Sequence, residues 1–137
     1  MSEQPDHAAH WLELADGDLA VARWILAGEG LPTYAVAFHA QQAAEKALKG
    51  LLERCRIPFQ RTHDLHLLFE LLPEAARRPF DLGDLDRLTP WAIEGRYGSD
   101  EPGFGRADAR ALLETAERIV KAARDEVARV DRQERRG

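Results

Sequence analysis

The tract from Phe38 to Lys49, within a longer helical segment, most constrains how this chain can fold. Residues 33–54 place small and aliphatic side chains at intervals of three and four, and a helix of 3.6 residues per turn gathers them on one broad face. A helix with such a face must bury it against other helices. The members of this face are Ala37, Ala40, Ala44, Leu48 and Leu51.

Two polar residues interrupt the apolar surroundings of this helix. On the helical wheel Gln41 and Glu45 are flanked by large apolar side chains, so solvation does not explain their presence. His39 and Lys46 instead fall on the side that we expect to face water. We therefore predict that Gln41 and Glu45 belong to a buried polar network.

Asp18 is a similar anomaly in the first helical segment, because it projects from the middle of an apolar stripe. An unpaired carboxylate in such a setting costs several kcal/mol, so it requires a cationic or hydrogen-bonding partner. A network that includes Asp18 either fixes how two helices pack or forms part of a functional site. The candidate partners of Asp18 are Lys49, His63 and Arg96.

The remaining sequence divides into further helices and loops. Glycines close the first helix, Pro32 begins the second, Thr62 is the predicted N-cap of the third, and Pro90 kinks or divides the fourth. The predicted helices span residues 7–27, 33–54, 63–72, 81–97 and 106–132. No alternating strand pattern or repeat is visible. The predicted fold class is therefore all-α, an up-and-down bundle of four to five helices.

Three acid–base pairs on the outer face of the last helix have the acid four residues before the base. This order gives each pair about 0.2–0.5 kcal/mol of helix stabilisation, and we expect the pairs to be solvated. The pairs are Glu114 with Arg118, Glu117 with Lys121, and Asp125 with Arg129.

The composition narrows the function classes. A chain of 137 residues is of single-domain size, so we expect one domain over residues 1–137, with a core at about 8–130 and frayed termini. The net charge of −5 leaves only a local basic patch, Arg54 with Arg56 and Arg61, for nucleic-acid contact. One cysteine, no long apolar run and no signal-peptide pattern predict a cytoplasmic protein. No phosphate loop or zinc spacing is present, so we predict no metal and no cofactor.

The order of short motifs resembles the HEPN domain family of bacteria and archaea. The run Phe38-His39-x-Gln41-Gln42-x-x-Glu45-Lys46-x-x-Lys49 is followed by Thr62-His63-Asp64-Leu65 and then by Arg96-Tyr97, with Asp18-Leu19 upstream. The resemblance covers roughly residues 8–130. It implies an all-helical bundle that is commonly a homodimer and is often encoded beside a minimal nucleotidyltransferase protein, which acts as its partner or antitoxin.

The resemblance also bears on catalysis. Many HEPN proteins are metal-independent endoribonucleases with an Arg, four to six residues and then a His. Arg96 matches the arginine, but the positions where the histidine is expected hold Glu101, Pro102 and Gly103. Arg56 and His63 have the same spacing, but in the predicted loop between the second and third helices. In some relatives a tyrosine behind the motif is adenylylated, and Tyr97 lacks that spacing.

Three functional hypotheses follow from these patterns. The preferred one is a HEPN protein that binds nucleotide or RNA phosphate without turnover and partners a minimal nucleotidyltransferase in a toxin–antitoxin-like pair. Its predicted ligand-binding residues are Lys49, His63, Arg96 and Tyr97, with Arg56 as a further candidate. The alternatives are a ribonuclease toxin that uses His63 with Arg96 or Arg56, and a structural adaptor. The adaptor would bind a partner helix through the apolar face of residues 33–54, through Trp24 or through Trp91.

Overall fold

The computed structural model describes residues 6–92 and 104–136. These residues form six α-helices and one 3₁₀ helix, without a strand, which confirms the all-α prediction. The elements are α1 (His7–Ala27), α2 (Thr33–Arg54), α3 (Leu65–Leu71), α4 (Glu74–Arg77), α5 (Leu82–Leu88), η1 (Thr89–Ala92) and α6 (Arg106–Arg136). Within the described residues no helix is both long and apolar enough to cross a membrane.

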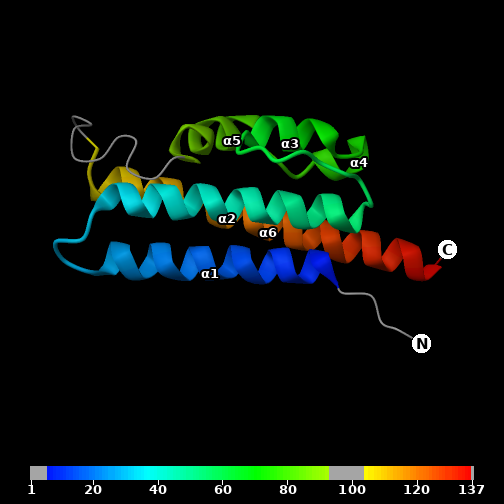
Figure 1. The fold of residues 1–137 in the computed structure, drawn as a ribbon, viewed down its shortest axis with the longest axis horizontal. Coiled ribbons are helices and arrows are strands. Elements are labelled where there is room, and N and C mark those ends of the chain that lie inside the picture. Colours follow the sequence, from blue (N-terminus) through cyan, green and yellow to red (C-terminus); the bar gives the residue numbers. More distant parts are fainter. Residues whose placement is uncertain (1–5, 93–103, 137) are drawn as a thin grey trace.

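Three long helices form the body of the molecule. Figure 1 shows α1, α2 and α6 running along the long axis, while the short helices α3, α4 and α5 lie on the side of α2 that is opposite α1. Each of the three long helices contacts the other two, and α2 also contacts α3 and α5. The central position of α2 explains its composition, because a helix with neighbours on several sides has little room for large side chains.

The core is built mainly on α2. Its alanines at 37, 40, 43, 44 and 47 are fully buried, as are Leu48, Leu51 and Leu52. The predicted packing face of α2 is therefore confirmed, and because it is buried inside this domain it is not available to bind a partner helix. Gly50 lets α1 approach closely: a Cβ atom at this position would lie 3.0 Å from the Cβ of Trp11 and 3.2 Å from the carbonyl oxygen of Ala8.

The buried face of α1 differs from the predicted stripe. The sequence places Trp11, Leu14, Ala15, Ala22, Ile25 and Leu26 on one apolar stripe. Ala15, Ala22 and Leu26 are buried as expected, but Leu12 and Leu19 take the place of Leu14 in the core. Leu14 is 38% exposed and Trp24 is 70% exposed. The apolar pattern of α1 is wide enough to allow either rotation, and contact with α2 and α6 selects one.

The short helices begin and end differently from the prediction. Asp64, not Thr62, is the N-cap of α3, since its carboxylate accepts hydrogen bonds from the backbone N–H groups of His66 and Leu67. Helix α4 had not been predicted. In the predicted fourth helix, α5 ends at Leu88 and a 3₁₀ turn containing Pro90 follows. This agrees with the division expected at that proline, which lacks an N–H group. Residues 93–97 lie outside the described part.

The outer face of α6 is less solvated than predicted, because α1 and α5 flank it. Arg118 donates to the buried carboxylate of Asp84 in α5 (3.1 Å), and Glu117 accepts from Arg23 in α1 (2.7 Å). Burial alone would raise the pKa of Asp84, but the hydrogen bonds from Arg118 and Arg87 outweigh it and hold that pKa below its ordinary value. Two pairs within α6 also differ from the predicted ones. They are Lys121 with Asp125, and Arg129 with Glu126.

Candidate functional site

Glu45 is the centre of a polar cluster between α2 and the start of α3. The residue is 3% exposed. Its Oε1 accepts a hydrogen bond from Gln41 Nε2 at 3.2 Å and contacts His63 Nδ1 at 2.9 Å. Its Oε2 accepts from Lys49 Nζ at 2.8 Å. The predicted burial of Gln41 and Glu45 is confirmed. Two of the four predicted ligand residues, Lys49 and His63, lie against the same carboxylate.

The geometry of this cluster follows from helical spacing. Gln41, Glu45 and Lys49 are four residues apart on α2, so their side chains lie one above another on one face. Gln41 also donates to the carbonyl oxygen of His63 at 3.0 Å, which ties the loop before α3 to this face. Lys49 Nζ lies 5.6 Å from the centre of the Trp11 ring. No buried side-chain polar atom in the described residues lacks a hydrogen-bond partner.

His63 is the member of the cluster that solvent can reach. Its side chain is 58% exposed, against 5% for Glu45 and 10% for Lys49. Because a carboxylate only accepts, its contact with Nδ1 favours the tautomer that carries the proton there, which leaves the lone pair of the neutral ring on Nε2. Nε2 has no partner among the described residues. The cluster thus presents one oriented imidazole nitrogen of His63 to solvent, while the ion pair of Glu45 and Lys49 stays buried.

Asp18 belongs to a separate cluster, and the predicted partners Lys49 and His63 are wrong, since both contact Glu45. Its carboxylate contacts His39 Nδ1 at 2.8 Å and accepts from Lys46 Nζ at 2.6 Å. His39 and Lys46, which we had expected to be solvated, are each only 25% exposed. His39 and Lys46 are seven residues, or two helical turns, apart, so both lie on the edge of α2 that meets α1. This spacing is the feature of the sequence from which their shared contact with Asp18 could have been predicted.

The predicted arginines do not join the Glu45 cluster in the described residues. Arg56 has a left-handed backbone (φ 60°), its side chain is 82% exposed, and it lies 3.7 Å from Glu134 of α6. It follows the end of α2 eleven residues after Glu45, a distance of about 16 Å along a helix, so the structure does not place it beside His63. Arg96 and Tyr97 lie outside the described residues.

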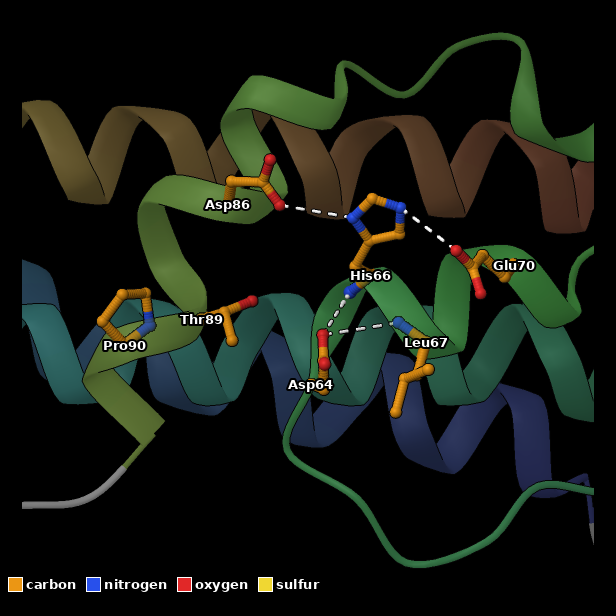
Figure 2. A pocket seen from close by; sticks show the side chains of 7 residues that line it. All are labelled: Asp64, His66, Leu67, Glu70, Asp86, Thr89 and Pro90. Carbon is orange, nitrogen blue, oxygen red and sulfur yellow. Dashed lines mark hydrogen bonds and ion pairs between the residues drawn. The ribbon is translucent and has the colours of Figure 1, made fainter.

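A second histidine lies in a neighbouring acidic pocket of about 630 Å³. Figure 2 shows the His66 ring between Asp86 of α5 and Glu70 of α3; its Nδ1 is 3.4 Å from Asp86 Oδ1 and its Nε2 is 3.3 Å from Glu70 Oε1. Asp64 also lines this pocket. Three carboxylates repel a phosphate, so this pocket does not suit the predicted ligand. No group of three or more potential metal ligands is found in the described residues.

Comparison with known proteins shows which family this chain belongs to. The family model described as HEPN domain matches residues 8–126, which include both polar clusters. The chain belongs to the HEPN family. No match was found among curated proteins.

Two solved structures have the same HEPN architecture. TT1696 from Thermus thermophilus is 32% identical, with a TM-score of 0.75, over 89% of this chain and 99% of that one. ST0689, described as an archaeal HEPN homologue, is 27% identical, with a TM-score of 0.68, over 88% of this chain and 97% of that one. The HEPN relationship predicted from the sequence motifs is confirmed.

Proposed function

We propose that this HEPN protein binds the phosphate of a nucleotide or RNA at the exposed side of the Glu45 cluster, without turnover of its own. His63 carries the proposal, because one of its ring nitrogens is fixed by a buried carboxylate while the other faces solvent. A protonated imidazole donates to phosphate oxygens from such a position. Lys49 balances Glu45 from inside, so we assign it to positioning the cluster. The sequence adds Arg96 as the second cation.

Calorimetric titration tests this binding. Wild-type protein and the variants His63→Ala, Arg96→Ala and His66→Ala are titrated with ATP, CTP and a short RNA, alone and in complex with a minimal nucleotidyltransferase. We expect His63→Ala and Arg96→Ala to weaken binding at least tenfold. His66→Ala is the matched control, because this histidine is also partly exposed but lies among carboxylates. Equal affinity for all four proteins, or no binding at all, contradicts the proposal.

One observation favours a second function, that of a metal-independent ribonuclease. A histidine oriented by a carboxylate is suited to take the proton of an RNA 2′-hydroxyl as that oxygen attacks phosphorus and the bond to the 5′-oxygen breaks. The Glu45–His63 contact supplies this orientation. RNA cleavage in EDTA that is lost in both His63→Ala and Arg96→Ala supports the enzyme. Absence of cleavage by the wild type contradicts the ribonuclease function and leaves phosphate binding without turnover as the proposed function.

We further propose that the protein is a homodimer and that a minimal nucleotidyltransferase is its partner in a toxin–antitoxin-like pair. The family relationship supports both, and α1 offers a surface for the dimer. Leu14, Val21 and Trp24 are exposed along one side of α1, and Gly17 between them has open space around it. An antiparallel twofold pairing centred on residue 19 sets Trp24 of one copy against Leu14 of the other, and Val21 against Gly17.

Light scattering of the purified protein tests the dimer. Trp24→Ser removes the largest exposed apolar side chain and should convert the dimer to a monomer. Leu82→Ser, at a residue of α5 that is 43% exposed, is the control and should leave the dimer intact. A wild-type monomer, or a Trp24→Ser dimer, contradicts this assignment of the interface.

A further inference from the structure

Two adjoining hollows lie over α3, and His63 is not among the residues that line either of them. The first is an apolar groove of about 690 Å³ between α3 and the loop that follows α2. The second is the acidic pocket of Figure 2. Leu67 and Glu70 line both hollows, so they form one continuous surface, which we call the α3 surface.

The apolar half of the α3 surface is exposed to solvent although hydrophobic side chains form much of its lining. Leu67 and Leu71 lie on consecutive turns of α3 and are 50% and 42% exposed. Pro58 and Phe59 form the opposite wall. Apolar side chains that remain in contact with water on both walls of a groove favour burial under a complementary apolar group. The groove is therefore suited to an apolar side chain of a ligand.

The acidic half provides the charge that selects the ligand. The side chains of Glu70 and Asp86 are 59% and 63% exposed. Within the described residues His66 is the one basic side chain that contacts either of them, since the nearby Arg77 donates to backbone carbonyl oxygens. A lysine or arginine of a ligand can thus pair with these carboxylates, whereas an anion is repelled.

The two halves are close enough for one short segment to occupy both. Leu67 and Glu70 are three residues apart on a helix, so their Cβ atoms are about 5–6 Å apart. A peptide therefore needs its apolar and basic side chains within about four residues of each other. We propose that the α3 surface binds an amphipathic basic peptide segment of another protein, with an apolar side chain in the groove and a lysine or arginine between Glu70 and Asp86. This inference does not depend on phosphate binding at His63.

Selection from a library of displayed random dodecapeptides tests the proposal with defined probes. We expect the selected peptides to combine a large apolar residue with lysine or arginine within four positions. Fluorescence polarisation of one selected peptide should show affinity at least tenfold weaker for Leu67→Ser and for the double variant Glu70→Gln, Asp86→Asn. Binding should also weaken as salt is added, because the paired charges are exposed.

Two controls separate recognition by this surface from general stickiness or misfolding. Leu31→Ser and Asp125→Asn change exposed residues elsewhere and should bind the peptide as the wild type does. Circular dichroism establishes that each variant is folded, and Leu71→Ser replaces Leu67→Ser if the latter is not. The proposal is overturned if no peptide is selected, if the selected peptides lack the apolar–basic combination, or if they bind the groove and acid variants as tightly as the wild type.

Discussion

The pair of Glu45 and Lys49 allows a quantitative test of how burial changes the effect of one ion pair. Glu45→Gln keeps the shape of the side chain, so it opens no cavity, but it leaves the ammonium group of Lys49, a side chain that is 10% exposed, without its countercharge. Removing one partner of a buried ion pair costs about 3–5 kcal/mol. We expect about 3 kcal/mol, the lower end, because the amide oxygen of the glutamine still accepts a hydrogen bond. A domain has about 5–15 kcal/mol of stability in total, so this loss is large.

The molecule contains a control pair with nearly the same geometry. Lys121 and Asp125 are also four residues apart on a helix and also have an N–O distance of 2.8 Å, but their side chains are 77% and 62% exposed. An exposed pair of this kind contributes about 0.3–0.5 kcal/mol, so Asp125→Asn should cost no more than about 0.5 kcal/mol. The two pairs share their spacing and N–O distance but differ in burial, and Glu45 has Gln41 and His63 as additional partners.

Urea unfolding followed by circular dichroism measures both effects. Urea is the right denaturant, because guanidinium chloride adds salt that screens the exposed pair. The double variant Glu45→Leu, Lys49→Met should recover most of the stability lost in Glu45→Gln, since apolar replacement of a buried ion pair is often close to neutral. If Glu45→Gln costs no more than Asp125→Asn, burial of the pair is not what makes Glu45 important and the argument fails.

Two further stability measurements test the packing of α1 and the role of Asp84. In the Trp24→Ser background, which removes the proposed dimer contact, Gly17→Ala should stabilise the protein by about 0.5–1 kcal/mol because Gly17 has open space within the single chain. Gly50→Ala should destabilise it by about 1–3 kcal/mol because the new methyl group meets Trp11; equal effects contradict this. The lowered pKa of Asp84 stabilises the fold above about pH 4, and this contribution is lost as the pH falls through the folded value. Asp84→Asn should lower the urea midpoint at neutral pH and flatten its decline between about pH 5 and pH 3.

The helices that the sequence located well are those with strong local signals. The bounds of α1 and α2 agree with the prediction, because Gly28 ends one helix and Pro32 precedes the other. Helix α4 was missed because its four residues are too few to show a helical period. Thr62 and Asp64 are both common N-cap residues, so residue type alone does not choose between them. Asp64 is the N-cap because the backbone N–H groups of His66 and Leu67 donate to its carboxylate.

The candidate site was predicted only in part. The helical wheel correctly singled out Gln41 and Glu45, because position around one helix is a local property. Lys49 was predicted as a partner of Asp18 but pairs with Glu45 instead. It did not predict that Asp18 would contact His39 and Lys46. A wheel fixes the positions of side chains around their own axis, but not the rotation of one helix against the next.

The sequence by itself determined the all-helical class, the bounds of α1 and α2, the burial of Gln41 and Glu45, and membership of the HEPN family. These properties depend on helical periodicity, on helix ends and on motif order, which one chain carries in full. Only the tertiary structure decided which face of α1 is buried, which cations neutralise Asp18 and Glu45, and that His63 presents one ring nitrogen to solvent. These properties depend on how the helices rotate and pack against one another, because contacts between distant segments form only when the whole core is assembled.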